Sequence, residues 1–327
     1  MYLVTGGAGF IGSNIAAALA ERGERVVVCD RLGQGDKWRN LAKLALEDLV
    51  APEDLERKLL GNGIRIEAVI HMGAISDTTE TDGDALAATN FGLSRRLWLW
   101  CAEHGVPLVY ASSAATYGDG TEGFDDDGSE AYLAKLRPLN GYGWSKHLFD
   151  RWVAQRIAEG NAAPPSWAGL KFFNVYGPNE AHKGAQASVA SHLYRQVAAG
   201  EPATLFQSHH PDYPDGGQLR DFIWVGDCVE VTLWLLGSAA PSGLYNVGTG
   251  QARSFADLAR ALFAAVGRDE NIRYVPTPEA IREKYQYFTE ARMERLHAAG
   301  YDKPFTSLED GVARYVTDFL ATSDPYR

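Results

Sequence analysis

The clearest chemical signal in this chain is a tyrosine four residues before a lysine, Tyr142 and Lys146, in the segment Tyr-Gly-Trp-Ser-Lys. On a helix this spacing places both side chains on one face. Because an ammonium group beside a phenol favours the phenolate, we expect a lowered pKa for Tyr142, whose phenolate would take a proton from an alcohol. Ser113 follows a strand-like run at residues 107–111 and would hydrogen-bond the reacting oxygen. Together the three residues predict a proton-transfer site.

A second signal is a glycine-rich loop between the first strand-like run and the first helix-like segment. Gly6, Gly9 and Gly12 are spaced three apart, with Phe10 and Ile11 before the last of them. A side chain at the turn would keep a pyrophosphate from the backbone amides, and the last glycine lets the helix pack closely on the sheet. The helix N-terminus adds free N–H groups and a positive dipole end. The loop therefore predicts dinucleotide binding.

The residues after the second apolar run bear on which dinucleotide is bound. Asp30 ends that run, and a carboxylate there would bind the hydroxyls of the adenosine ribose, which favours NAD. Arg31 follows at once, and Lys37 lies further along the same segment. Cations there could hold a 2′-phosphate, which favours NADP. These residues leave both cofactors open.

A sheet must position these groups, and the first third of the chain has the pattern of one. Helix-like segments such as 11–22 and 85–102 alternate with short apolar runs at residues 2–5, 25–29, 68–71 and 107–111. Continuous apolar runs separated by helices are typical of parallel strands buried on both faces. We therefore predict an α/β fold, a Rossmann-type doubly wound parallel sheet, with ligands at the carboxyl ends of its strands.

The rest of the chain is less regular and predicts a smaller α/β lobe that binds the substrate. Ser254 and Ser307 are placed as helix N-caps, and residues 222–225 predict a short strand. We expect the chain to cross between lobes more than once. The expected division is a cofactor-binding Rossmann domain over 1–171 with a returning segment at about 221–250, and a substrate lobe from 172–220 and 251–327.

Composition narrows the function classes. The 327 residues include 31 Lys and Arg against 42 Asp and Glu, a net charge of −11, which argues against a nucleic-acid partner and an anionic membrane surface. No apolar run approaches the ~20 residues of a membrane span, and no secretory signal is visible. The three cysteines lack metal-site spacing. We expect a cytoplasmic protein with a small-molecule partner and no metal.

The glycine-rich loop, the strand-end serine and the Tyr-x-x-x-Lys segment occur in an order that resembles the extended short-chain dehydrogenase/reductase family of nucleotide-sugar enzymes. The resemblance covers essentially the whole chain. It implies a catalytic triad of Ser113, Tyr142 and Lys146, with Lys146 also on the nicotinamide ribose. It further implies cofactor contacts at Met72, Gly73, Ala74, Ile75, Ser76, Asn90 and Val175.

The same resemblance extends to the substrate side. It implies that Asn174 faces the sugar nucleotide and that Arg220 binds a phosphate of the substrate. The segment His182-Lys183-Gly184, among others, resembles a narrower group of the family that acts on an ADP-activated heptose. That likeness implies Lys183 as a second catalytic residue, tightly held NADP, and a homo-oligomer, a pentamer. It also implies substrate contacts at His192, Phe206 and Tyr285.

The implied reaction inverts C6 of the heptose through transient oxidation to a 6-keto intermediate and return of the hydride, for lipopolysaccharide core synthesis. A UDP-hexose 4-epimerase or another nucleotide-sugar epimerase is the alternative, because the triad chemistry is shared. A dehydratase is disfavoured, since family dehydratases usually carry an acidic pair where this chain has Ala114 and Ala115. A regulator that had lost the chemistry would usually lack the tyrosine or the lysine.

Overall fold

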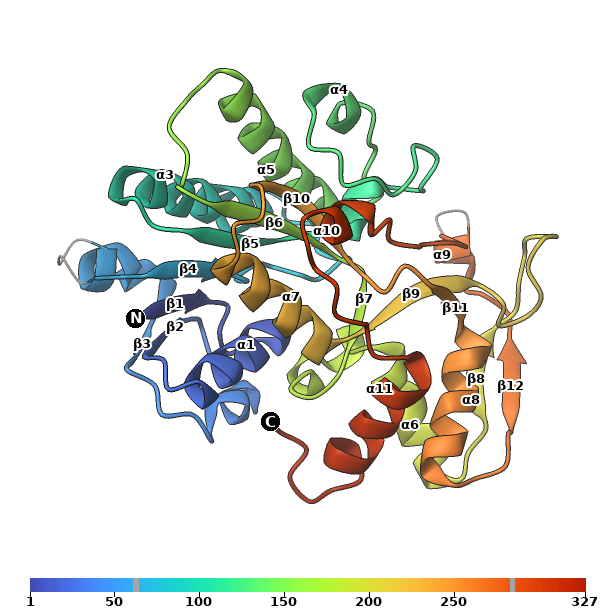
Figure 1. Ribbon diagram of the computed structural model, residues 1–327. Helices are drawn as coiled ribbons and strands as arrows, with labels where there is room; N and C mark the ends of the chain where they lie inside the picture. The colour runs from blue at the N-terminus through green and yellow to red at the C-terminus, as the bar shows by residue number, and fades with distance from the viewer. Residues whose placement is uncertain (61–64, 283–285) are drawn as a thin grey trace.

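Seven parallel strands form the central sheet of the computed structural model, which describes residues 1–60, 65–282 and 286–327 (Figure 1). Their spatial order is β10-β6-β5-β4-β1-β2-β3, so the chain order reverses beside β1. In open α/β sheets, ligands bind at such a reversal. The strands are β1 (Tyr2–Thr5), β2 (Val26–Cys29), β3 (Asp48–Val50), β4 (Ala68–His71), β5 (Leu108–Ser113), β6 (Trp167–Phe172) and β10 (Gly243–Val247).

Helices cover both faces of this sheet. On one face, α1 (Phe10–Glu21) packs against α7 (Val225–Gly237), and the other face carries α3 (Leu93–His104) and α5 (Gly141–Ala158) (Figure 1). Strands β2 and β4 are buried along their whole length, and β1, β5 and β6 at all but one residue each, as expected of parallel strands between two helical layers. The predicted Rossmann-type doubly wound fold is confirmed.

The helix predicted over residues 85–102 is divided into three parts. It begins as α2 (Gly83–Leu86), continues as a π-helical stretch (Ala87–Gly92), and becomes α3. Short helices elsewhere in the described chain are Lys37–Leu41, Pro52–Asp54, Glu56–Leu60, Ala114–Tyr117, α4 (Glu130–Leu133), Ala181–Gln186, α9 (Glu279–Arg282) and α10 (Glu294–Ala298).

Further along the chain lie two small sheets and a second apolar cluster. One sheet has the order β11-β9-β7 and the other pairs β12 with β8. Their elements are β7 (Asn174–Tyr176), α6 (Val189–Ala199), β8 (Ala203–Phe206), β9 (Leu219–Trp224), β11 (Ala252–Ser254), α8 (Phe255–Val266), β12 (Ile272–Val275), α11 (Leu308–Tyr315) and a π-helical end (Val316–Leu320). The residues of α6, α8 and α11 share this cluster. The division into two lobes with the expected boundaries stays a prediction.

The sequence predicted the starts of two helices correctly and the bounds of one strand incorrectly. Ser254 accepts a hydrogen bond from the N–H of Asp257, and Ser307 does the same at the start of α11, so both N-caps are confirmed. The strand predicted over 222–225 has wrong bounds, because β9 begins at Leu219 and α7 already begins at Val225. The extra residues of β9 pair antiparallel with β11, a partner that the sequence did not predict.

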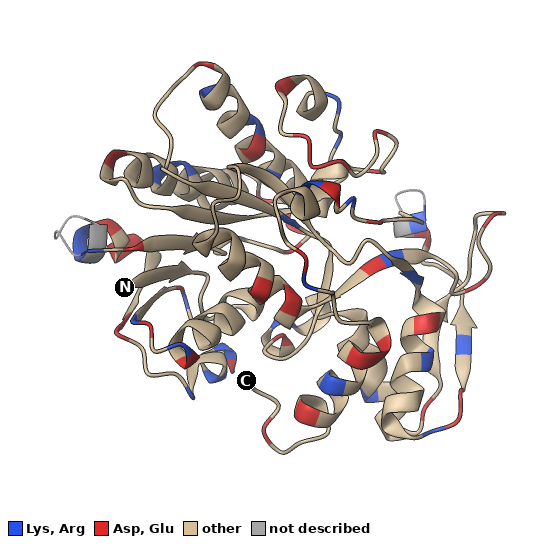
Figure 2. Cartoon of the chain, viewed as in Figure 1, with Lys and Arg blue, Asp and Glu red and all other residues tan. Residues whose placement is uncertain are grey.

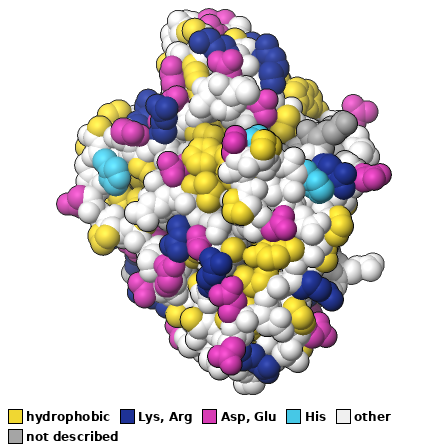
Figure 3. Space-filling model, turned by 90° about the vertical axis from the view of Figure 1, so that its right-hand side faces the viewer, with side chains coloured by type: hydrophobic (Ala, Val, Ile, Leu, Met, Phe, Trp, Pro, Cys, Tyr) yellow, Lys and Arg dark blue, Asp and Glu magenta, His cyan; other side chains and the backbone are white. Residues whose placement is uncertain are grey.

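Charged residues of both signs are spread over the helices, strands and loops (Figure 2). On the face seen in Figure 3, Lys and Arg alternate with Asp and Glu and with apolar groups, and neither sign forms a continuous field. Within the described residues, no helix is both long enough and apolar enough to cross a membrane.

Candidate active site

Most of the predicted site residues line one cavity of about 540 Å³ at the carboxyl ends of the central strands. Parallel strands end at a common edge, so the loops that follow β1, β2 and β4 meet there with the end of β5. The predicted residues in its lining are Gly6, Gly9, Phe10, Ile11, Gly12, Asp30, Lys37, Met72, Gly73, Ala74, Ser76, Ser113, Tyr142, Lys146, Asn174, Val175 and Lys183.

The loop after β1 has the close backbone packing that its glycines predict. A Cβ on Gly6, whose φ is +65°, would lie 2.5 Å from the backbone nitrogen of Gly73. A Cβ on Gly12 would lie 2.2 Å from the carbonyl oxygen of Gly6. No side chain caps the N-terminus of α1, and its first turn holds no acidic residue. This bare, positively polarised helix end at the cavity fits a pyrophosphate.

Asp30 lies at the end of β2 with both carboxylate oxygens engaged. Oδ2 accepts from the N–H of Ala8 at 2.9 Å, and Oδ1 accepts from the N–H of Arg31 and from Nζ of Lys37, both at 2.7 Å. The Asp30–Lys37 ion pair is largely shielded from solvent. A cation therefore stands beside the carboxylate that is expected to meet the adenosine ribose.

A second pocket adjoins the first and shares five of its lining residues, Gly6, Asp30, Lys37, Gly73 and Ala74. Arg31 and Ile75 line this second pocket, together with Glu53 and Arg96. Arg31 is exposed, and its Nε lies 3.2 Å from the Glu53 carboxylate. Two pockets on either side of a shared wall provide room for the two halves of an extended dinucleotide.

The proton-transfer residues come from α5 and the end of β5. Asn140 caps α5 by accepting a hydrogen bond from the N–H of Gly143 at 2.8 Å. Gly143 allows close approach of the helix, because a Cβ there would lie 2.7 Å from the carbonyl oxygen of Ala115. Tyr142, in the first turn, hydrogen-bonds Ser113. The structure thus brings together the strand-end serine and the helix tyrosine.

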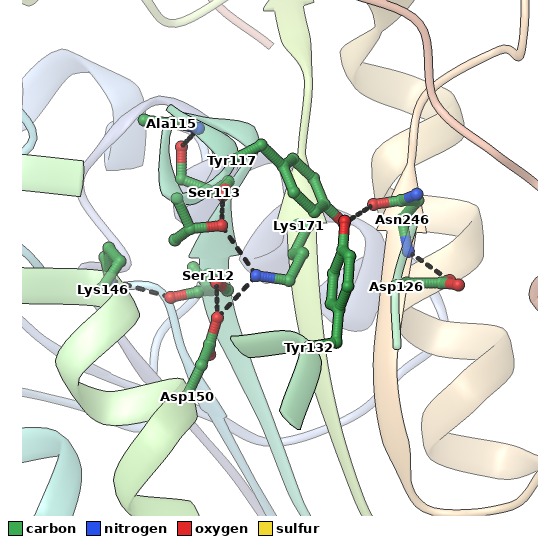
Figure 4. Close-up of polar contacts among 12 residues, drawn as sticks. Ser112, Ser113, Ala115, Tyr117, Asp126, Tyr132, Lys146, Asp150, Lys171 and Asn246 are labelled. Carbon is green, nitrogen blue, oxygen red and sulfur yellow. Dashed lines mark hydrogen bonds and ion pairs between the residues drawn. The ribbon is translucent and has the colours of Figure 1, made fainter. Parts of the chain in front are cut away.

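Lys146 is buried one turn further along α5 and donates from Nζ to the carbonyl oxygen of Ala111 at 2.8 Å (Figure 4). Burial lowers the pKa of Lys146 to about 8, against the opposing charge of Asp150. Burial raises the pKa of Tyr142, and the hydrogen bond with Ser113 opposes that rise. The predicted lowering of the Tyr142 pKa is therefore wrong here, because desolvation of the phenol outweighs a lysine that is itself desolvated.

Lys183 lies on another wall of the same cavity, in the short helix Ala181–Gln186. Its Nζ is 5.6 Å from the centre of the Phe10 ring. Burial lowers the pKa of Lys183, with Glu180 opposing. Burial also lowers the pKa of the adjacent His182 to about 4, so that ring is neutral near pH 7. A buried lysine with a lowered pKa is suited to proton transfer.

Asn90 is fully buried in the π-helical stretch and is not in the lining of either pocket. Its amide nitrogen donates to Ile75 O and to Ser145 Oγ, both at 2.9 Å, and its amide oxygen accepts from the N–H of Ile75 at 2.8 Å. In this structure Asn90 thus fixes the loop after β4 against α5. Its predicted direct contact with the cofactor stays a prediction.

Three predicted substrate contacts are absent from this lining, and their substrate roles stay predictions. His192, Phe206 and Arg220 are outside the lining of both pockets, and Tyr285 lies outside the described residues. Arg220 is mostly buried and donates to the carbonyl oxygens of Leu219 and Gln286. The guanidinium predicted to bind a phosphate is therefore engaged by backbone carbonyls.

Sequence reasoning missed several residues of this site. Phe222 and Leu258 line the cavity from β9 and α8, although no chemical motif marks them. Asn40 donates from its amide to Ala8 O at 2.9 Å and to Asn179 O at 3.0 Å. It thereby ties the phosphate loop to the segment that carries Lys183. A lone asparagine in a short helix, Lys37–Leu41, gives no sequence signal for this role.

The arrangement combines two chemical capacities. A phosphate-binding helix end and an adjoining pocket can hold a dinucleotide, and two acid–base groups, Tyr142 and Lys183, stand on separate walls of one cavity. Such a site can remove a proton from an alcohol on one side and return one from the other.

Comparisons with known proteins agree with a dinucleotide-binding site of this kind. Residues 2–248 match the NAD dependent epimerase/dehydratase family. The chain is 49% identical, over 100% of both chains, to the ADP-L-glycero-D-manno-heptose-6-epimerase of Nitratidesulfovibrio vulgaris. The crystal structure of the Helicobacter pylori ADP-L-glycero-D-manno-heptose-6-epimerase has a TM-score of 0.80 at 29% identity, covering 97% of this chain and 95% of that one.

An epimerase with a different sugar nucleotide in its name is also among the structural neighbours. The Thermus thermophilus UDP-glucose 4-epimerase in complex with NAD has a TM-score of 0.74 at 29% identity, covering 95% of this chain and 96% of that one. The shared family model and the full-length relative decide the affiliation. The chain belongs to the NAD dependent epimerase/dehydratase family.

Proposed function

We propose that this chain is an ADP-glyceromanno-heptose 6-epimerase, which interconverts the D-glycero and L-glycero forms of ADP-β-D-manno-heptose. The observation that carries the proposal is the 49% identity, over the full length, to a protein of that name. The cavity supports it, since Tyr142 and Lys183 line the same cavity from two different helices. The predicted role in lipopolysaccharide core synthesis and the homo-oligomer stay predictions of the resemblance.

The first half-reaction is assigned to Tyr142. Its phenolate accepts the proton of the C6 hydroxyl, and Ser113 holds the reacting oxygen by a hydrogen bond. Lys146, buried one turn further along α5, is assigned to stabilise that phenolate through the positive charge of its ammonium group. A bound nicotinamide dinucleotide supplies the acceptor of the C6 hydride and its donor for the return step.

The second half-reaction needs a proton donor or acceptor on the other side of the planar C6 carbon. Lys183 is the candidate, because it lines the cavity from a different element and burial lowers its pKa. Return of the hydride to the opposite face of C6 inverts the centre without net oxidation. Which base serves which epimer follows from the variants described in the Discussion.

We propose NADP as the resident cofactor, with NAD as the alternative. Lys37 neutralises Asp30 at 2.7 Å, and Arg31 lines the same pocket. A carboxylate alone would repel a 2′-phosphate, whereas the carboxylate and lysine together leave a cation to bind it. The NAD complex of a neighbour supports the dinucleotide site but not the phosphate.

Lys37→Met is expected to shift cofactor content from NADP towards NAD by about tenfold, the effect of one charge-assisted hydrogen bond. The protein is purified without added cofactor and unfolded, and the released NADP and NAD are quantified by mass spectrometry. Lys43→Met is the matched control, because Lys43 is about half exposed and pairs with Asp324. An unchanged ratio in Lys37→Met would assign the 2′-phosphate to other residues.

The decisive assay follows ADP-D-glycero-β-D-manno-heptose by proton NMR with the purified protein and no added cofactor. Conversion to the L-glycero epimer is expected, and would also show that the cofactor co-purifies. UDP-glucose is run in parallel, because a UDP-glucose 4-epimerase is a structural neighbour. Turnover of UDP-glucose but not of the heptose, with or without NADP and NAD, would replace the proposed function by the alternative.

A further inference from the structure

A buried ion pair lies directly behind the cavity and has no part in the mechanism above. Lys171 of β6 and Asp150 of α5 are both fully shielded from solvent, with Nζ 2.7 Å from Oδ2 (Figure 4). Removing two charges from water costs several kcal/mol per ion, so apolar residues of similar size would often be equally stable there. A contribution to the stability of the fold is therefore a weak explanation for this ion pair, and its position suggests a different role.

The pair joins α5, which carries Tyr142 and Lys146, to β6, the strand that pairs with β5. Asp150 follows Lys146 by one turn of α5, and its Oδ2 also accepts from Ser112 Oγ at 2.6 Å. Lys171 is the register partner of Ser112 in the β5–β6 ladder. The carboxylate thus fastens helix α5 to the end of β5, one residue before Ser113.

A second branch reaches Ser113 itself. Lys171 Nζ donates to Thr116 Oγ1 at 2.7 Å, and the Thr116 hydroxyl donates to the backbone oxygen of Ser113 at 2.8 Å. Thr116 is fully buried, so neither bond competes with bulk water. The Lys171 ammonium group donates one hydrogen bond to the Asp150 carboxylate of α5 and another to Thr116 in the turn after β5. Figure 4 shows both bonds at the same nitrogen.

We propose that Lys171 and Thr116 are positioning residues, which hold Ser113 at hydrogen-bonding distance from Tyr142 by tying the turn after β5 to α5. The proposal rests on the function proposed above, in which Ser113 holds the reacting oxygen. A displacement of that serine weakens the hydrogen bond in the transition state more than substrate binding. The expected signature is a loss in kcat without a matching rise in KM.

The test compares two hydroxyl deletions in the same network. Thr116→Val removes the bond to Ser113 and keeps the side-chain shape. Tyr110→Phe removes a bond to the other oxygen of Asp150, at 3.2 Å, which does not lead to Ser113. We expect Thr116→Val to lower kcat about tenfold at unchanged KM, with Tyr110→Phe close to wild type and Thr116→Ser restoring most of the loss.

Equal kcat values for Thr116→Val and Tyr110→Phe would overturn the positioning role, whatever their melting temperatures. Should Thr116→Val not fold, Thr116→Cys keeps the volume with a weaker donor and undergoes the same comparison.

Crystal structures of the two variants give a reading that needs no substrate. The distance between the Ser113 and Tyr142 oxygens is expected to lengthen in Thr116→Val only, and an unchanged distance would contradict the proposal. Failure of the wild-type chain to convert the heptose would count against the proposed function and leave this structural comparison intact.

Discussion

Tyr142→Phe is expected to slow epimerisation by about 10³-fold, within the range for loss of a general acid–base group. The substitution keeps the ring and removes only the oxygen that accepts the C6 hydroxyl proton. Because Tyr142 hydrogen-bonds Ser113, the serine also loses a partner in the cavity. The measurement is kcat from the NMR assay at saturating substrate, together with the amount of cofactor that co-purifies.

Cofactor content in Tyr142→Phe should equal that of the wild type, since the phosphate loop and the Asp30 pocket are untouched. Tyr132→Phe is the matched control, because the Tyr132 hydroxyl donates to Gly123 O and Tyr132 does not line the cavity. A kcat within tenfold of wild type in Tyr142→Phe would remove the phenol from the proton transfer.

Lys183→Met has the second largest expected effect, a loss of about 10²-fold in epimerisation. Methionine keeps the length and the packing on Phe10 but cannot carry a proton. Because burial lowers the pKa of Lys183, the wild-type amine is able to exchange protons where an exposed lysine would stay charged. Lys183→Arg should be equally slow, since a guanidinium does not deprotonate in proteins.

Because Tyr142 and Lys183 line the cavity from different helices, we expect Lys183→Met to affect the two epimers differently. One epimer should still reduce the bound cofactor in a single turnover, seen as near-ultraviolet absorbance of reduced nicotinamide, whereas the other should not. The active epimer is then the substrate of Tyr142. Lys303→Met, an exposed lysine paired with Glu230, is the control. Full turnover by Lys183→Met would exclude the lysine from the mechanism.

Local spacing explains which parts of the site the sequence predicted. The glycines of the phosphate loop and the Tyr142–Lys146 pair act within one turn or one helix, so their geometry follows from neighbours in the chain. Parallel strands then bring these segments to one edge without further information. For that reason the sequence was sufficient to predict the fold class and to bring Ser113, Tyr142 and Lys146 together in one site.

The remaining features depend on pairings that spacing does not reveal. Lys171 meets Asp150 only because β5 and β6 pair in one particular register beneath α5. The pKa of Tyr142 is set by burial, which a helix-face argument does not include. Arg220 donates from two of its nitrogens to the backbone carbonyls of Leu219 and Gln286, a pairing that its sequence context does not reveal, and its phosphate contact stays a prediction.

The place of β10 in the sheet bears on how the chain emerges from a ribosome. This edge strand, Gly243–Val247, pairs with β6 along its length, yet about seventy residues of other structure separate the two. Until it has been synthesised, β6 presents an open edge of unpaired backbone groups next to a buried lysine, the kind of edge that recruits other chains. A fragment ending near residue 171 is therefore expected to aggregate, whereas one that extends beyond Val247 can complete its sheet.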